Sequence, residues 1–248
     1  MRRLACPLAV SALLLGPLPA AGQSPDGPLV TDRPDFTESA AAVPTGRFQL
    51  EVGATRSEEG GENVLEVGEA LLRIGARPGW EVRVQAPSWI AGPGEDGIGD
   101  AGVGFKVELP PAAGADLAFL AMTSIPVATG DGGVDAWQPE AALAAAWTLP
   151  APLSLSSNLG IGVPEVDGER RIESWLSAAL GIEIAPRVGA FVEAYGFVDG
   201  EDGAGPAFAD AGLTFLVHDD FQLDARAGAG FGRANGDRYV GVGASRRW

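Results

Sequence analysis

The feature that most constrains this chain is a two-residue alternation of apolar with polar or small side chains, repeated in segments of about ten residues. Between Phe221 and Phe231 every odd position is apolar, whereas the even positions carry Gln222, Asp224, Arg226 and two glycines. Successive side chains of a β-strand point to opposite faces, so the pattern predicts strands with one apolar and one polar face. About twelve such segments begin near Thr45, Leu65, Trp80, Ile98, Asp116, Trp137, Leu153, Ile172, Arg187, Phe208, Phe221 and Arg238.

The connections between these segments alternate in length. Tight turns are expected at 77–79, 110–114, 150–152, 185–186 and 218–220, and longer, acidic, glycine-rich loops at 57–63, 91–97, 127–136, 164–171, 199–207 and 232–237. Short turns at one rim and long loops at the other are typical of transmembrane barrels with both termini in the periplasm. A tilted strand crosses a bilayer in ~9 to 11 residues, and only a closed sheet leaves no unpaired edge in hydrocarbon. We therefore expect an all-β fold, a single closed antiparallel up-and-down transmembrane β-barrel of about 12 strands over residues 45–248.

The first 22 residues have the composition of a cleaved signal peptide. Arg2 and Arg3 precede an apolar run from Leu4 to Leu18, which small residues follow up to Gly22. The lone cysteine, Cys6, lies in this stretch, so the mature chain would contain no thiol. Downstream, no run approaches the ~20 apolar residues of a membrane helix. The predicted location is the bacterial outer membrane, with residues 23–44 as an N-terminal periplasmic or plug segment before the barrel.

The distribution of charge indicates an enclosed polar interior. A net charge of −16 argues against a nucleic-acid partner, which needs a basic surface. Ionised groups facing lipid would each cost several kcal/mol, so the alternation should turn them into the lumen. The expected lumen-lining residues are Glu51, Arg73, Glu81, Arg83, Asp100, Lys106, Glu173, Glu193, Asp210, Asp224 and Arg226. Two interpretations stay open, a lumen used for transport or charges that only brace a narrow interior, because twelve strands lie between filled and open barrels.

The stretch from Thr31 to Ser39 is too polar and too interrupted by proline to form a membrane strand. Our hypothesis is that it folds back into the lumen, where Asp32, Arg33, Asp35 and Glu38 pair with lumen charges and plug or gate the barrel. A disordered periplasmic tail is the alternative.

Aromatic residues suggest contacts with lipid and with the assembly apparatus. Trp248 ends an alternating strand, which resembles the C-terminal signal by which barrels are recognised for assembly. The predicted partners are therefore the barrel-assembly machinery and outer-membrane lipid. Most of the tryptophans Trp80, Trp89, Trp137, Trp147 and Trp175 fall near expected strand ends, as an aromatic girdle requires, with ordinary core positions as the alternative.

Catalytic and metal-binding patterns are weak in this sequence. The one histidine, His218, falls in an expected turn, and a mature chain without cysteine has neither the usual zinc ligands nor a Cys–His pair. The acidic loops at 95–100 and 199–202 lack the ligand spacing of a calcium loop. We expect no catalytic residues, no metal site and no cofactor.

The segment TDRPDFTESAAAVPTGRFQLEVG (31–53) resembles the start of the outer-membrane β-barrel family of meta-pathway phenol-degradation transporters. The pieces EALLRIGARPGWEVRVQAP (69–87), GIGDAGVGFKVEL (97–109) and YVGVGASRRW (239–248) extend the likeness along the chain. The resemblance implies a barrel that passes small aromatic or other apolar compounds, and it transfers no binding residue. The expected function is therefore a passive outer-membrane channel whose small-molecule substrate stays open. The alternative is a non-conducting barrel that serves as an envelope or surface interaction protein.

Overall fold

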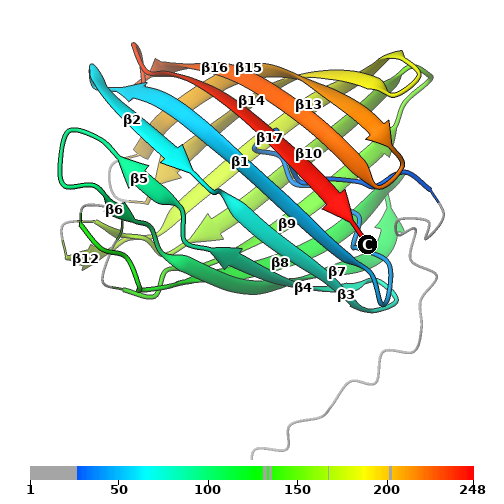
Figure 1. Cartoon of the computed structure of the whole chain (residues 1–248), viewed down its shortest axis with the longest axis horizontal. Helices are drawn as coiled ribbons and strands as arrows, with labels where there is room; N and C mark the ends of the chain where they lie inside the picture. Colours follow the sequence, from blue (N-terminus) through cyan, green and yellow to red (C-terminus); the bar gives the residue numbers. More distant parts are fainter. Residues whose placement is uncertain (1–26, 131–132, 134–135, 167, 201–202) are drawn as a thin grey trace, which may run out of the picture.

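The chain forms a closed barrel, seen in a computed structural model that describes residues 27–130, 133, 136–166, 168–200 and 203–248 (Figure 1). The expected signal peptide lies outside these residues. The wall is built of twelve antiparallel strands: β1 (Phe48–Glu59), β3 (Ala70–Arg77), β4 (Trp80–Ala86), β7 (Ala101–Ala112), β8 (Ala115–Ile125), β9 (Pro139–Thr148), β10 (Leu153–Gly162), β13 (Glu173–Ala185), β14 (Val188–Asp199), β15 (Gly203–His218), β16 (Phe221–Gly232) and β17 (Arg238–Arg247).

Closure joins the first strand to the last. Each long strand pairs with the next along the chain, and β1 pairs with β17 in a register that runs from Gln49 opposite Arg247 to Glu58 opposite Arg238. The predicted single closed up-and-down barrel of about 12 strands is confirmed. No helix in the part of the chain that the structure describes is long and apolar enough to cross a membrane.

Five short strands lie at the loop end. β2 (Glu62–Val67), β5 (Trp89–Ala91) and β6 (Gly97–Ile98) extend the wall, whereas β11 (Glu165–Val166) and β12 (Glu169–Arg170) form a separate small hairpin. The prediction of one unbroken strand starting near Leu65 is wrong, because β1 pairs first with β3 and then, from Ala54 to Glu59, with β2. Gly68, at φ +92°, allows the break between β2 and β3.

The loop expected at 57–63 is a tight hairpin instead. β1 continues to Glu59 and β2 starts at Glu62, which leaves only Gly60 and Gly61 between them. Both glycines have positive φ, 59° and 88°, as a two-residue turn between twisted strands requires. Turns of a few residues, such as that between β15 and β16, lie at the opposite end beside the C-terminus (Figure 1).

The two faces of the wall differ sharply in chemistry. Large apolar side chains cover the outside, with Leu159, Leu176 and Val242 each about 60% exposed. Charged side chains point inward, and Arg73, Arg83 and Lys106 are at most 1% exposed. A soluble protein buries apolar groups and exposes charges, so this inverted arrangement fits an exterior solvated by lipid.

One tryptophan departs from the expected aromatic girdle. Trp89 and Trp137, at or beside strand ends, are 44% and 50% exposed. Trp175 occupies the same face of β13 as Glu173 and the buried Ser177, so its ring enters the lumen and lines a cavity there. Its assignment to a girdle is therefore wrong, because the alternation of β13 turns odd-numbered positions inward.

We expect an arginine on the outer face to destabilise the barrel according to its depth in the membrane. Leu213, 55% exposed on β15, lies well inside the strand, whereas Val217, 42% exposed, is four residues nearer the turn at 219–220. Leu213→Arg should lower the free energy of unfolding in lipid vesicles by about 2–4 kcal/mol and Val217→Arg by about 0–1 kcal/mol. Equal costs in a denaturant titration would contradict a lipid-facing exterior.

Candidate functional site

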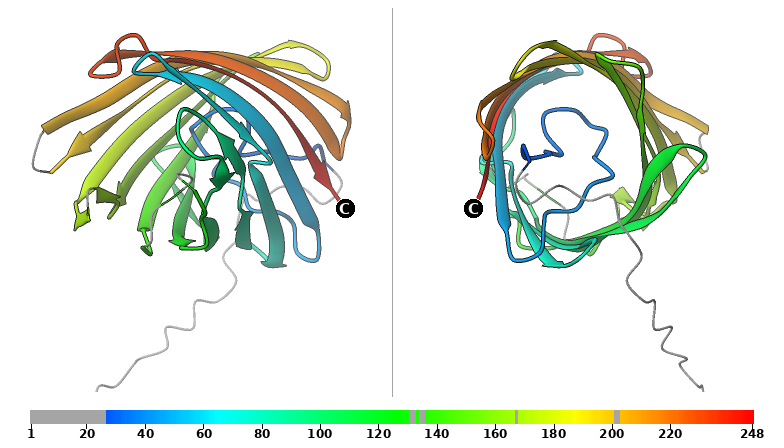
Figure 2. Two further views of the ribbon diagram at one scale, coloured as in Figure 1. Left: turned by 60° about the vertical axis from the view of Figure 1, so that its left-hand side comes forward. Right: turned by 90° about the vertical axis from the view of Figure 1, so that its right-hand side faces the viewer.

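The segment before the first strand lies inside the barrel. The right-hand view of Figure 2, along the barrel, places this N-terminal segment (residues 27–47, blue) within the ring of strands. Between residues 27 and 47 it forms neither helix nor strand, so its backbone N–H groups need acceptors from elsewhere. Side chains of the wall supply them.

The acceptors come from strands on opposite sides of the lumen. Glu51 of β1 accepts from the N–H groups of Asp32 and Arg33, at 3.1 and 3.0 Å. Glu193 of β14 accepts from Phe36 and Thr37, both at 2.7 Å. Three further contacts continue along the segment: Glu38 N–H to Asn158 (2.6 Å), Ala42 N–H to Glu108 (2.7 Å) and Val43 N–H to Glu81 (2.9 Å). The segment is thus fixed through its backbone by polar wall residues.

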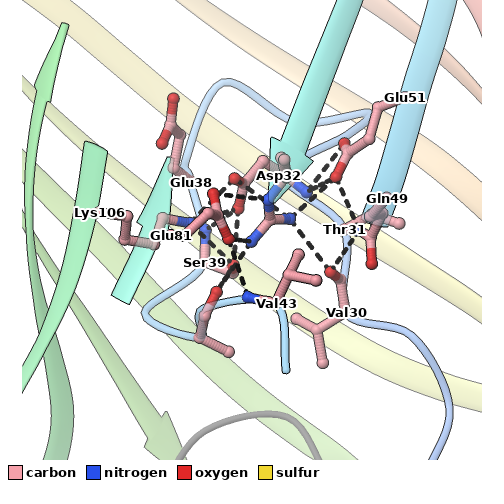
Figure 3. Close-up of polar contacts among 12 residues, drawn as sticks. Val30, Thr31, Asp32, Glu38, Ser39, Val43, Gln49, Glu51, Glu81 and Lys106 are labelled. Carbon is pink, nitrogen blue, oxygen red and sulfur yellow. Dashed lines mark hydrogen bonds and ion pairs between the residues drawn. The ribbon is translucent and has the colours of Figure 1, made fainter. Parts of the chain in front are cut away.

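Asp32 is the centre of a buried ionic network (Figure 3). Its carboxylate lies 2.9 Å from Lys106 Nζ, 2.8 Å from Arg83 Nη1 and 3.2 Å from Arg73 Nη1. Arg73 also contacts the wall carboxylates Glu51 and Glu81, at 2.8 and 2.9 Å. Glu38 adds a second anion from the segment, 2.9 Å from Arg83 Nη2. Ion pairs as well as amide contacts therefore join the segment to β3, β4 and β7.

Arg33 crosses the seam where the barrel closes. Its guanidinium lies 2.7 Å from Glu69 and 3.4 Å from Asp224, and it donates to the carbonyl of Val242 at 3.2 Å. Gly53 on β1 and Gly243 on β17 face each other across the seam, and a Cβ on either would lie 2.4 Å from this guanidinium. Glycine at these two wall positions provides the space that Arg33 fills.

A second cluster of carboxylates meets the segment at β14 and β15. Glu193 stands directly opposite Asp210, which accepts a hydrogen bond of 2.7 Å from the Tyr239 hydroxyl. Phe36 of the segment stacks on Tyr195, with ring centroids 4.3 Å apart. Aromatic stacking and hydrogen bonds to Glu193 thus hold Phe36 and Thr37 of the segment against β14.

Two aspartates of the segment lie in opposite electrostatic environments. Burial acts to raise the pKa of Asp32, but Arg73, Lys106 and Arg83 outweigh it and hold that pKa well below its usual range. Burial raises the pKa of Asp35 well above its usual range, and the neighbouring Glu193 carboxylate raises it further. Ionised Asp32 therefore stabilises the docked segment, whereas ionised Asp35 opposes docking.

Most of the expected lumen residues lie on the inner face of the wall. Those that are buried there are Glu51, Arg73, Glu81, Arg83, Lys106, Glu193, Asp210 and Asp224. Arg226 is half-buried, with its guanidinium 5.1 Å from the Tyr239 ring centroid, and Glu173 lines two cavities. Asp100 lies at the loop end, where it accepts the N–H groups of Val127 and Ala128.

Reasoning from charge misses the uncharged members of this site. Asn158 both accepts from Glu38 N–H and donates to Glu38 O, and Gln49 donates to Val30 O at 2.8 Å. Thr37 bonds Ser177 at 2.7 Å through its hydroxyl, which also contacts Glu193. The alternation of β1 and β10 places Gln49 and Asn158 on the polar face. The sequence therefore indicates that these side chains point into the lumen, although they carry no charge.

Two adjoining cavities remain beside the segment, of about 180 and 410 Å³. Phe36 and Glu38 of the segment help to line the smaller one, and residues at the loop end, among them Ser88 and Asp100, line the larger. Met122, Glu140, Glu173 and Trp175 line both. The lumen therefore holds space for a small molecule between the segment and the loop end.

His218 ends β15 at the turn, on the rim opposite the long loops, and is exposed. Its Nδ1 accepts the N–H of Asp220 at 3.2 Å. Trp248, the residue expected to mark the chain for assembly, is 51% exposed and exchanges backbone hydrogen bonds with Phe48 across the seam.

The same aspartate-to-asparagine change should act in opposite directions at positions 32 and 35. Asp32→Asn removes the carboxylate that Lys106, Arg83 and Arg73 share. The free energy of docking of the segment should therefore become less favourable by about 3–5 kcal/mol. Asp35→Asn removes a carboxylate that opposes docking when ionised, so it should strengthen docking. Hydrogen exchange of the amides in 27–47 at neutral pH measures both effects.

The pH dependence of docking supplies the control. Because the pKa of Asp35 is raised in the docked state, wild-type protection should decline as the pH rises through that value, and Asp35→Asn should reduce this decline. The contribution of Asp32 has the opposite sign and is lost only as the pH falls through its lowered pKa. Exchange rates are compared after correction for their intrinsic pH dependence, and the same sign of change in both variants would contradict the two environments.

Comparison with solved structures identifies the same fold in outer-membrane channels. The COG4313 outer membrane channel from Pseudomonas putida F1 matches with a TM-score of 0.65 and 11% identity, over 88% of this chain and 100% of that chain. The KdgM porin in complex with disordered oligogalacturonate matches at 0.60 and 8%, over 80% and 98%. The NanC porin matches at 0.58 and 9%, over 79% and 98%.

Comparison of sequences identifies the family of the chain, whereas the solved structures identify only its fold. A search of curated proteins finds no match. One family model, described as "Putative MetA-pathway of phenol degradation", matches residues 31–248, which include the N-terminal segment from Thr31 onward and the whole barrel. The resemblance seen in the sequence is confirmed, and the chain belongs to this phenol-degradation family.

Proposed function

We propose that this chain is a passive outer-membrane channel for small aromatic or other apolar compounds, and that its N-terminal segment plugs or gates the lumen. The observation that carries the proposal is the segment itself, which lies within a closed barrel and is joined to the wall by hydrogen bonds and ion pairs. Such contacts can break and re-form without disturbing the strand ladder.

The outer surface supports a location in a membrane. Its exposed side chains include Val192, Leu213 and Val240, each between 55% and 57% exposed, on three strands of the wall. An apolar exterior around a polar interior is what an outer-membrane barrel requires. The porins and the channel that share this fold support the same location and a channel role.

The interior supports passage of small molecules. The larger cavity, about 410 Å³, falls within the range of roughly 300–1,000 Å³ that is usual for small-molecule sites. Phe36, Trp175 and Phe197 present aromatic surface to the adjoining smaller cavity. The family description names phenol degradation, and an aromatic compound would find aromatic partners here.

Removal of the segment should open the channel. In planar bilayers, the variant lacking residues 23–42 should show a severalfold larger single-channel conductance than the full chain, because the lumen loses its obstruction. The control is Arg238→Gln, which breaks an exposed pair with Glu58 at the loop end and leaves every segment contact in place. That variant should conduct like the wild type.

Two other outcomes would be decisive. Unchanged conductance and ion selectivity after the deletion would remove the gating role of the segment. A barrel that passes no solute, with or without the segment, would remove the channel proposal and favour a non-conducting interaction protein.

A further inference from the structure

The smaller lumen cavity combines carboxylates with aromatic rings. Its lining includes Glu38 and Phe36 of the segment, Glu140 of β9, Glu173 and Trp175 of β13 and Phe197 of β14. We propose that this cavity binds small organic cations in which a protonated amine is attached to an aromatic or apolar body. The inference rests on the proposed function, whose substrate class it narrows.

The charges of the wall are divided between its two halves. Strands β8, β9, β10, β13, β14 and β15 contain no lysine or arginine, whereas Glu140, Glu173, Glu193 and Asp210 lie on the lumen face of this half. The basic residues next to these strands in the chain are Arg170 and Arg171, in the connection before β13, and Arg187, in the turn before β14. These six strands therefore present carboxylates, and no lysine or arginine, to the cavity.

Three buried lumen cations on the other half are engaged by anions, whereas Arg226 of β16 is half-buried and lies over the Tyr239 ring. Arg73, Arg83 and Lys106 contact Asp32, Glu51, Glu81 and Glu38, and their side chains are at most 2% exposed. Arg83 is paired with Glu38, which lines the cavity, through Oε1 of that carboxylate. Oε2 of Glu38 is buried and has no hydrogen-bond partner among the described residues. This oxygen thus keeps an unused capacity to accept a hydrogen bond beside the cavity.

A glycine leaves the space that one aromatic ring of the cavity occupies. Trp175 stands opposite Gly160 in the β10–β13 register, and a Cβ on Gly160 would lie 2.0 Å from the Trp175 ring. The ring therefore lies flat against β10, where any larger residue would displace it. Phe36 and Phe197 meet edge to face, with ring centroids 5.7 Å apart. Aromatic faces attract cations as well as apolar groups, and carboxylates nearby strengthen the preference.

The arrangement suits an organic cation better than a metal ion. Glu140 and Glu173 lie on strands separated by β10, and the described residues contain no group of three or more histidine, cysteine or acidic side chains that could hold a metal. Leu120, Ala121, Met122, Ala141 and Ala142 add apolar surface to the lining. An ammonium group can contact the carboxylates while its apolar body rests on Trp175 and these residues.

Calorimetric titration of the full mature chain in detergent tests this with three probes of one shape: benzylammonium, benzyl alcohol and benzoate. We expect benzylammonium to bind about tenfold tighter than benzyl alcohol, and benzoate to bind weakest, because only the cation gains from the carboxylates. The double change Glu140→Gln with Glu173→Gln should abolish the advantage of benzylammonium over benzyl alcohol. Trp175→Leu should weaken both.

The matched control is Glu183→Gln, the same substitution on the same strand as Glu173. Glu183 is exposed near the turn end of β13 and does not line the cavity, so this change should leave all three affinities unaltered. Should the double variant fail to fold, Glu140→Gln and Glu173→Gln alone should each reduce the advantage of benzylammonium. Equal binding of the three probes, no binding of any, or the same loss in Glu183→Gln would overturn the inference.

Conductance separates this inference from the proposed function. Cation selectivity in a salt gradient, together with block by benzylammonium and not by benzoate, is the result expected if both hold. Binding of benzylammonium to a barrel that never conducts would overturn the channel alone. Conductance without preference among the probes would overturn the cation site alone.

Discussion

Backbone hydrogen bonding where water is scarce is the constraint on which the rest of this structure depends. In hydrocarbon the strands have no solvent partner, so the sheet closes by pairing β1 with β17. The same requirement applies inside, where the irregular N-terminal segment offers donors that no strand satisfies. Glu51 and Glu193 accept two backbone N–H groups each, which explains why carboxylates stand at these wall positions.

Charge balance connects the segment to the wall. Arg73, Arg83 and Lys106 are three buried cations, and the wall carboxylates that contact them are Glu51 and Glu81. Asp32 and Glu38 add two further carboxylates from the segment. A buried ion left without its partner is costly, so the segment and the cationic half of the wall stabilise each other.

The sequence predicts the barrel well because strand periodicity is a local property. Alternation places Glu51, Arg73 and Lys106 on the inner face without knowledge of their neighbours. It specifies neither register nor depth, which depend on contacts between distant strands. The division of the second strand at Gly68 and the inward position of Trp175 therefore differ from expectation. The pattern does not single out Asn158, because an uncharged side chain on the polar face gives no sign that it bonds the backbone of the segment.

The contacts of Arg33 also imply that, during biogenesis, the segment docks after the C-terminal strands have formed. Its partners include the carbonyl of Val242 on β17 and the carboxylate of Asp224 on β16, which follow the other strands of the wall along the chain. Leu29 N–H likewise bonds the carbonyl of Asp219, in the turn that precedes them. The N-terminal segment, which is synthesised before the strands, can thus make these contacts only after the hairpin of β16 and β17 has formed. A docked segment therefore indicates that the barrel has closed.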